Sequence, residues 1–446
     1  MRGWRSALCA AVLVLALPAV ASARLEVSVF ARVPAPGYPA NALVAKDGTV
    51  YAGTFHSFSS PSDTGPSKVF AWSSTGKLER TYTLAGQTPG AAHGVQVAAT
   101  DRAGTLYLLD QDPARVLRLN PKTGAQSTWA TFASVPACSG VPNGNCTLGS
   151  GGNPPEPDFA AWGPDGSLYV TDYNQALIWR VPPSGGKATV WLTDARFNGV
   201  IVGPAGIELM PDHSTLMLST GGGGTNASTG KLYTLPINPN GTPGALHQLW
   251  ESGAADAPDG FAIARSGNIY IALVGPFANA VLELSPTGQQ LARVPVNASA
   301  NNMQQVPFDA PGSVTFLGNQ VLVANQSAIN NDPTHWALLE INAGEPGFPV
   351  SLPPAHPATR YRLRVKPHHS RRGHEITFHF TATVRTASGQ RRPLAGALIR
   401  FAGHAVRTNR KGHATLTLKL THKGRYRARL IRNRRRLAVV IVRVRP

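Results

Sequence analysis

The chain has 446 residues, 42% of them hydrophobic and 15% charged, which is enough for a large core and more than one domain. Its formal net charge of +19 is unevenly spread: residues 357–446 contain 24 of the 42 basic residues and a single acid, Glu375. The rest of the chain has 18 basic and 22 acidic residues. This distribution excludes a uniformly basic protein and predicts a mildly acidic part joined to a very basic C-terminal domain.

The N-terminus has the pattern of a signal peptide. Arg2 and Arg5 precede the apolar run 7–20, and Ala21-Ser22-Ala23 forms a small-residue cleavage site. A membrane span needs about 20 apolar residues, and this run is shorter. We therefore expect a signal peptide over residues 1–23, export to a secreted or envelope-associated location, and no transmembrane span in the mature chain.

A bend followed by a short strand recurs six times, at intervals of about 48 to 62 residues, in phrases such as DGTVYAGT, DGSLYVTD and SGNIYIAL. Repeats of this length built from short strands are typical of a β-propeller with one four-stranded blade per repeat. The pattern predicts an all-β fold with a six-bladed propeller over residues 24–345. The last repeat lacks a fourth strand, and we expect residues 25–33 to supply it and close the ring.

Two cysteines remain after removal of the signal peptide. Cys138 and Cys146 lie in the Gly-, Pro- and Asn-rich stretch ACSGVPNGNC. In an oxidising compartment this pair predicts a local disulfide that closes one loop.

The turns that enter the innermost strands are expected at the mouth of the propeller channel. They read PANALV, AHGVQV, PDFAAW, PAGIEL, PDGFAI and PGSVTF. Aligning them places Asn41, His93, Asp158 and Asp259 around one mouth. Such oxygen ligands suit a hard cation such as Ca²⁺ or Mg²⁺, and a carboxylate with an imidazole also suits general acid–base catalysis. The competing interpretation is structural: Asp commonly caps its own turn, and His93 before Gly94 is a turn residue.

The phrases PDGFAIARSGNIYIA and PAGIELMPDHSTLML resemble repeats of the gluconolactonase / senescence marker protein / luciferin-regenerating enzyme family. This resemblance, over about residues 25–345, implies a six-bladed propeller and a divalent-metal-dependent lactonase. The family holds its metal with a Glu in the first turn, an Asn in a PNG turn and an Asp in a PDG turn. Asp259 matches the last of these, and Asp158 lies where the family has a substrate-facing polar residue. Here Ala205 replaces the Asn, and the first turn offers Ala40 and Asn41 without a Glu.

Two functions follow from these residues. In the first, the propeller hydrolyses a small lactone or ester, with Asp259, Asp158 and His93 as catalytic residues and a divalent cation held by Asp259, Asp158 and Asn41. In the second, it is a non-catalytic secreted propeller that binds a small-molecule ligand or an envelope component at the same mouth and is tethered to the cell envelope by its basic C-terminal domain. The incomplete ligand set favours the second, and the family resemblance favours the first.

A Pro-rich segment, residues 346–357, predicts an extended linker. Residues 358–446 then alternate short strands with turns, which predicts a small β-sandwich. The phrase GALIRFAGHAVRTNRKGHATLTLKLTHKGRYRARL resembles the immunoglobulin-like domains at the ends of exported bacterial proteins. Nucleic acid is a frequent partner of so basic a domain, but export argues against it. We expect an anionic cell-envelope polymer, a lipid headgroup or a polysaccharide instead, and a solvated spacer is the alternative.

Overall fold

The computed structural model describes residues 23–57, 65–136, 154–197, 203–221, 229–254, 256–275, 278–354, 360–385, 391–432 and 435–446. The chain divides into two compact units, Met1–Pro354 and Ala355–Pro446. Residues 1–22 of the expected signal peptide, and both Cys138 and Cys146, lie outside the described residues. Within the described residues, no helix has the length and apolar character needed to cross a bilayer.

The first unit is built from six blades of antiparallel strands. Blades 1 to 3 comprise β2 (Pro39–Val44), β3 (Val50–Thr54), β4 (Lys68–Trp72) and β5 (Leu78–Thr83); β6 (Val95–Thr100), β7 (Leu106–Gln111), β8 (Ala114–Leu119) and β9 (Gln126–Thr131); and β10 (Pro157–Trp162), β11 (Leu168–Asp172), β12 (Leu177–Val181) and β14 (Thr189–Thr193). The short strand β13 (Gly186–Lys187) runs parallel to β9 at the edge of blade 2.

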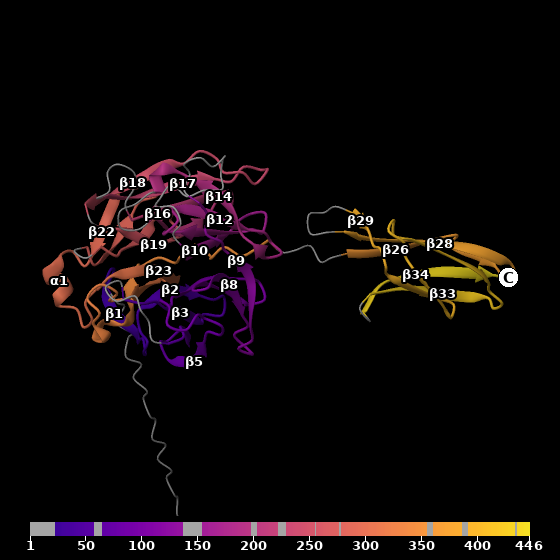
Figure 1. The fold of residues 1–446 in the computed structure, drawn as a ribbon, viewed down its shortest axis with the longest axis horizontal. Helices are drawn as coiled ribbons and strands as arrows, with labels where there is room; N and C mark the ends of the chain where they lie inside the picture. Colours follow the sequence, from indigo (N-terminus) through magenta and orange to yellow (C-terminus); the bar gives the residue numbers. More distant parts are fainter. Residues whose placement is uncertain are drawn as a thin grey trace, which may run out of the picture. The chain divides into compact units, whose positions relative to one another are not determined.

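Blades 4 to 6 comprise β15 (Pro204–Leu209), β16 (Thr215–Thr220), β17 (Thr229–Pro236) and β18 (His247–Ala254); β19 (Pro258–Ile263), β20 (Ile269–Leu273), β21 (Ala280–Leu284) and β22 (Gln290–Val294); and β23 (Pro311–Leu317), β24 (Gln320–Asn325), β25 (Ala337–Asn342) and β1 (Val27–Arg32). The helices among the described residues are short: η1 (Ala195–Phe197), α1 (Ala298–Asn302) and η2 (Pro333–His335). The first strand of each blade contacts the first strand of the next, and β23 contacts β2, so these six strands line a closed ring (Figure 1).

The N-terminal strand completes the last blade, as the sequence predicted. Strand β1 pairs antiparallel with β25 from Val27 opposite Ile341 to Arg32 opposite Ala337. Just before β1, the Arg24 guanidinium lies 2.5 Å from both carboxylate oxygens of Glu283, a buried residue of β21 in blade 5. The chain start is therefore fixed to two blades that come last in the sequence.

The hydrophobic core consists of six clusters, one between each pair of neighbouring blades. In β7, for example, Leu106 and Leu108 pack toward blade 1, whereas Tyr107 and Leu109 pack toward blade 3. Both faces of such a strand are buried, which is why these strands read as nearly continuous apolar runs instead of alternating ones.

Every innermost strand contains a β-bulge. The pairing shifts register once in each of the six. In four of them the shift falls between the first and fourth residues, as between Pro157 and Ala160 in β10. A bulge bends the strand and redirects a side chain. The bulges therefore act on the second and third residues of these strands, where the side chains of the channel mouth begin.

The first part of the predicted linker lies on the propeller. The N–H of Phe348 donates to the carbonyl of Ile263 (2.7 Å), and the Ser351 hydroxyl donates to the carbonyl of Trp162 (3.0 Å). Further along, the Arg102 side chain donates to the carbonyl of Pro353 (3.0 Å). Residues 345–354, which we call the strap, thus run from blade 5 to blades 3 and 2 at the end of the channel where the innermost strands finish.

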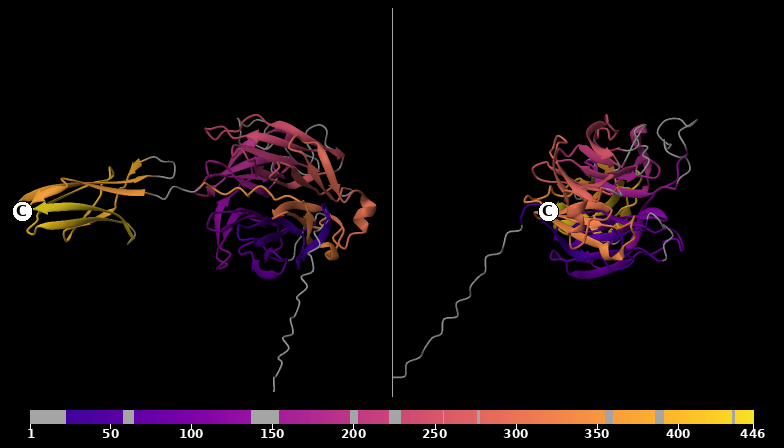
Figure 2. Two further views of the ribbon diagram at one scale, coloured as in Figure 1. Left: turned by 180° about the vertical axis from the view of Figure 1, so that it is seen from behind. Right: turned by 90° about the vertical axis from the view of Figure 1, so that its left-hand side faces the viewer.

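The second unit consists of two sheets around its own core (Figure 2). One sheet contains β26 (Arg360–Lys366), β28 (Glu375–Arg385), β29 (Arg391–Pro393) and β32 (His413–Lys419). The other contains β27 (His369–Arg371), β34 (Arg435–Arg445), β33 (Gly424–Arg432), β30 (Leu398–Phe401) and β31 (His404–Arg407). Phe378 and Phe401, one from each sheet, meet at 5.0 Å between ring centroids. The predicted all-β class is confirmed for both units, and the immunoglobulin-like kinship stays a prediction.

Ring closure can be tested by removing the N-terminal strand. A chain that starts at Val33 lacks β1, so the outer edge of β25 loses its partner. Losing about five backbone hydrogen bonds worth about 1 kcal/mol each should lower the melting temperature by about 10 °C or more in differential scanning calorimetry. Ser28→Ala is the control, because it removes only an exposed hydrogen bond to Glu340. A truncated chain with the same melting temperature as the intact chain would contradict closure of the ring by β1.

Candidate functional site at the channel mouth

Two carboxyl groups, one buried and one partly buried, lie at the mouth of the channel. Asp158 and Asp259 are the second residues of β10 and β19, and Asp158 is only 6% exposed. Burial raises the pKa of Asp158 to about 8; a hydrogen bond from Gln96 opposes this shift, and the charges of Glu156 and Asp172 add to it. Burial also raises the pKa of Asp259 well above its ordinary value, and the charge of Asp158 raises it further.

The two groups therefore titrate together. The charge of Asp158 disfavours ionisation of Asp259, and neither carboxylate has an ion-pair partner among the described residues. Burial and this repulsion both favour the protonated forms of the two groups. The mouth thus combines an acid with a potential base.

Gln96 fixes the orientation of Asp158. Its side-chain amide donates to Asp158 Oδ1 (2.8 Å), and its carbonyl oxygen accepts from the N–H of Asn41 (2.6 Å). Gln96 is the second residue of β6, the position that Asp158 occupies in β10. Sequence analysis missed this residue, although its place in AHGVQV, one residue after the first strand position, would have identified it.

One oxygen of the pair has no partner. Asp259 Oδ1 is out of contact with solvent and accepts no hydrogen bond from the described residues. A buried acceptor left unsatisfied costs roughly 1–3 kcal/mol, so such atoms in native proteins call for an explanation. A proton, a cation or a ligand donor at this oxygen would satisfy it.

His93 is held away from the first strand position. Its Nδ1 lies 2.8 Å from the carbonyl of Gly65, and its Nε2 lies 2.6 Å from the carbonyl of Thr88. The residue is buried and precedes β6 by two positions. The structure therefore places Asp158 and Asp259 at the same position of two innermost strands, and it places Gln96, not His93, next to Asp158. A catalytic role for His93 stays a prediction.

Further acidic groups surround Asp158. Asp172, at the end of β11, accepts from the indole of Trp179 (2.9 Å) and from the N–H groups of Gln175 and Glu156. Burial raises the pKa of Asp172 to about 6, against the effect of these hydrogen bonds. Burial also raises the pKa of the Glu156 carboxyl, which bonds to the Tyr173 hydroxyl. Asp172 is a well-satisfied structural carboxylate that positions this loop.

A cavity of about 410 Å³ adjoins this acidic region. Glu156 forms part of its wall, together with His56, Gln111 and Asp112. Glu156 directly precedes β10, and Gln111 ends β7, so the cavity lies on the same side of the propeller as Asp158. Its volume falls within the usual range of about 300–1,000 Å³ for small-molecule sites.

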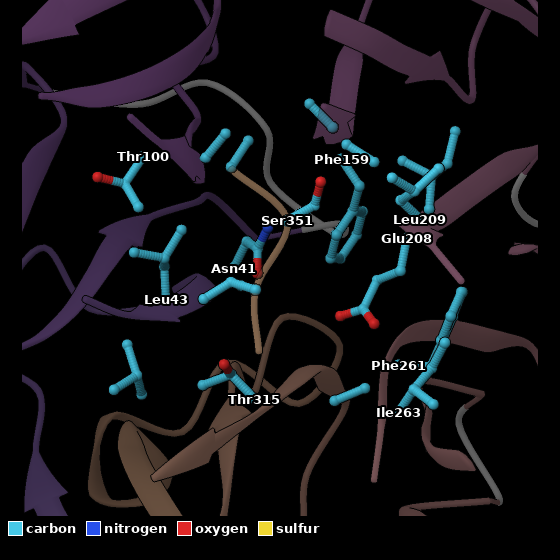
Figure 3. Close-up of a pocket in the computed structure, with 18 of the residues that line it drawn as sticks. Asn41, Leu43, Thr100, Phe159, Glu208, Leu209, Phe261, Ile263, Thr315 and Ser351 are labelled. Carbon is cyan, nitrogen blue, oxygen red and sulfur yellow. The ribbon is translucent and has the colours of Figure 1, made fainter. Parts of the chain in front are cut away.

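Below the mouth the channel narrows. A Cβ added to Gly260 would lie 2.7 Å from the Phe159 ring and 2.8 Å from Ser313 Cβ, so blades 3, 5 and 6 meet closely there. Further down, a cavity of about 100 Å³ is bounded by the innermost strands and by strap residues 348–351. Figure 3 shows Asn41 and Glu208 reaching into this space from opposite walls. Asn41 thus lines the lower cavity with its side chain while its N–H supports Gln96.

Glu208 is a partly buried acid of the channel that sequence analysis missed. It is the fifth residue of β15, and burial raises its pKa to about 8 against the effect of a hydrogen bond from the main chain of Ile263. The corresponding residues of neighbouring strands include Leu43, Ala161 and Ala262. The sequence signal that could have identified Glu208 is an acid at a position where these other repeats have an apolar residue.

The metal-binding potential of the site is limited. Among the residues that the structure describes, no three His, Cys, Asp or Glu side chains are arranged to hold a metal ion. The predicted set of Asp259, Asp158 and Asn41 contains only two such residues. It offers oxygen ligands alone, which is the chemistry of Ca²⁺ or Mg²⁺.

Several solved structures resemble the chain. Catalytically inactive virginiamycin B lyase from Staphylococcus aureus is 14% identical, covers 71% of this chain and 99% of its own, and has a TM-score of 0.43. A luciferin-regenerating enzyme is 12% identical over 71% and 95% of the two chains (TM-score 0.47). The aldose sugar dehydrogenase from Streptomyces coelicolor is 13% identical over 72% and 99% (TM-score 0.46).

No family model matches the sequence, and no curated protein matches it either. Likenesses as distant as those above carry no argument about activity. The propeller rests on its own strand order, and the function rests on the residues of the mouth and channel.

The buried state of Glu208 makes stability depend on pH. Because its folded pKa lies above its unfolded value, the folded state binds more protons between about pH 4.5 and pH 8. Stability from this group is complete below that window and falls as the pH rises through it. Glu208→Gln should therefore raise the melting temperature by several degrees at pH 8.5 and change it little at pH 4.5.

The control for this measurement is Glu79→Gln, which removes an exposed acid of β5. Its melting temperature should equal that of the unaltered chain at both pH values. An equal effect of Glu208→Gln at pH 4.5 and pH 8.5 would contradict the assignment of a buried, protonated carboxyl.

Proposed function

We propose that the propeller is a hydrolase of small lactones or esters in which Asp158 and Asp259 are the reacting pair. The ionised member would take a proton from the attacking water, and the protonated member would donate one to the departing alkoxide oxygen. The substrate would bind in the cavity beside Glu156, whose volume suits a small molecule. We also propose that the chain is exported, on the strength of its N-terminal sequence.

The observation that carries this proposal is the coupled, buried pair without a counter-charge. A pair of carboxyl groups that shares protons near neutral pH is the usual way to obtain an acid and a base from identical side chains. Gln96 supports the assignment, because it fixes one oxygen of Asp158. The unsatisfied Asp259 Oδ1 supports it too, because this buried acceptor lacks a hydrogen-bond partner among the described residues.

A divalent cation could neutralise the same pair in place of the proton. Asp158 and Asp259 would hold it, without the predicted ligand Asn41, whose side chain lines the cavity below the constriction; the ion would polarise a carbonyl group of the substrate. The repulsion between the two carboxylates and the unpartnered Asp259 Oδ1 fit such an ion. The departures from the lactonase pattern at Ala205 and Ala40 imply weak binding.

The hydrolase proposal predicts a specific loss of activity. In a panel of small lactones and aryl esters, Asp158→Asn and Asp259→Asn should each lower kcat/KM by about 100-fold or more, the usual contribution of general acid–base groups. Asp165→Asn is the matched control, because this acid of blade 3 lies in the turn before β11 and pairs with Arg180. It should retain activity within about threefold.

The alternative is a binding propeller without catalysis. In that case ligands of the panel would bind saturably and be recovered unchanged, and both mouth variants would weaken binding alone. Turnover that survives both substitutions would contradict the assignment of the reacting pair.

Cation binding should depend on pH, because the ion displaces protons from the pair. Calorimetric titration with Ca²⁺ should show affinity rising between pH 6 and pH 9, with proton release detected by comparing two buffers of different ionisation enthalpy. Asp259→Asn should abolish the signal, and Asp165→Asn should leave it unchanged. Absence of binding to 1 mM Ca²⁺ at pH 8.5 would exclude a cation from this site.

A further inference from the structure

One face of the C-terminal unit is covered by arginine. In β33 and β34 the side chains alternate: Ala428, Leu430, Val442 and Val444 are buried, and the residues between them point outward. Adding the exposed arginines of the adjacent strands gives seven on one sheet. We call this the basic face; it consists of Arg371 (β27), Arg443 and Arg445 (β34), Arg425, Arg427 and Arg429 (β33), and Arg400 (β30).

The register sets these charges directly opposite one another. Arg425 pairs with Arg443, and Arg429 is opposite Arg400 on its other side. Like charges at opposed positions of a sheet destabilise it. The single acid of residues 357–446, Glu375, lies on the other sheet opposite Lys419. The basic face therefore has an uncompensated excess of positive charge.

The other sheet also carries exposed basic residues, but in a different arrangement; they are Arg362, Arg364, Lys366, Arg391, Arg392 and Lys419. Along its outer face, threonines of β28 and β32 oppose one another, and the hydroxyls of Thr377 and Thr417 lie 2.8 Å apart. Arg362 and Arg364 of β26 are opposite Thr383 and Thr381. The basic face thus sets arginine opposite arginine, whereas these two arginines of β26 are opposite threonines.

Two exposed aliphatic side chains lie within the basic face. Val439 is 42% exposed and is opposite Arg429, and Ile441 is 36% exposed and is opposite Arg427. Among the described residues of this unit, Val439 and Ile441 are the large hydrophobic residues that are exposed. Guanidinium groups around a small apolar centre are the composition of a surface that contacts lipid headgroups and the adjoining acyl region.

Other polyanions fit this face less well. All five aromatic residues of 357–446 belong to the core or pack against it, so the described part offers no stacking platform for sugar rings or single-stranded bases. The described residues of this unit also contain no helix that could enter a DNA groove. Phosphate is the anion that a planar guanidinium binds best, by paired hydrogen bonds.

We propose that the basic face binds the surface of a membrane containing anionic phospholipid. The arginines contact lipid phosphates, while Val439 and Ile441 enter the interface between headgroups and acyl chains. This site is separate from the channel mouth and does not depend on the activity proposed for it.

The test is sedimentation of the full-length chain with vesicles of phosphatidylglycerol and phosphatidylcholine, compared with phosphatidylcholine alone. Each basic residue near an anionic surface contributes about 1 kcal/mol, so R425Q/R427Q/R429Q should weaken partitioning by about 100-fold. R362Q/R364Q/K366Q is the matched control: it removes the same charge from the opposite sheet and should weaken binding by less than about fivefold.

The aliphatic pair gives a second readout. Electrostatic attraction is screened within about 8 Å at physiological salt, so the loss in the arginine variant should shrink as salt rises. The loss in V439S/I441S, expected at about tenfold, should persist in 0.5 M NaCl because burial of apolar surface is not screened. Thermal melts of all variants establish that they are folded. If R425Q/R427Q/R429Q fails to fold, R400Q/R443Q reports on the same face.

Several results would overturn the proposal. Equal binding to vesicles with and without phosphatidylglycerol would show that binding does not require anionic lipid. Equal losses in the two triple variants would show that net charge, not the face, determines binding. Tight binding of soluble polyphosphate, together with no effect of V439S/I441S on vesicles, would assign the face to a phosphate polymer such as the envelope polymer expected from the sequence.

Discussion

The pairing of β1 with β25 is the contact on which the rest of the propeller depends. A blade buries both of its faces only if it has a neighbour on each side, so the core cluster between blades 6 and 1 requires a closed ring. The mouth has the same requirement. Asn41, Gln96, Asp158 and Asp259 come from blades 1, 2, 3 and 5, and an open arc of blades would not hold them around one opening. The site therefore depends on ring closure.

The two units treat uncompensated charge in opposite ways. In the propeller, Asp158, Asp259 and Glu208 are removed from water, and the resulting cost is reduced by keeping protons on the carboxyl groups. In the C-terminal unit the guanidinium groups cannot lose their protons, so they remain hydrated on the outside of a sheet. Burial thus makes the acids sensitive to pH near neutrality, whereas exposure makes the arginines sensitive to salt.

Much of the fold could be predicted from the sequence, because each repeat carries its own bend and strand and because the sixth lacks an outer strand. Asp158 and Asp259 could be placed at one mouth, since the same Pro-Asp turn begins both β10 and β19. Gln96 was missed, because the prediction chose the first polar residue of AHGVQV, His93, instead of the second residue of the strand. The bulges could not be predicted either, because they arise from pairing between strands and leave no local pattern in the sequence. The composition of the strap is that of a linker, and its hydrogen bonds to the carbonyl groups of Ile263 and Trp162 show instead that it packs on the propeller.

The strap also determines how mechanical load enters the propeller. Any pull on the C-terminal unit travels along the chain and reaches Pro353 and Ser351 before it reaches β25. The strap contacts with Arg102, Trp162 and Ile263 are spaced along the chain, so they would break one after another, as in peeling. Strand β25, held between β24 and β1, carries load only after these contacts have gone. The strap therefore bears the load first and protects β25, the strand whose pairing with β1 closes the ring.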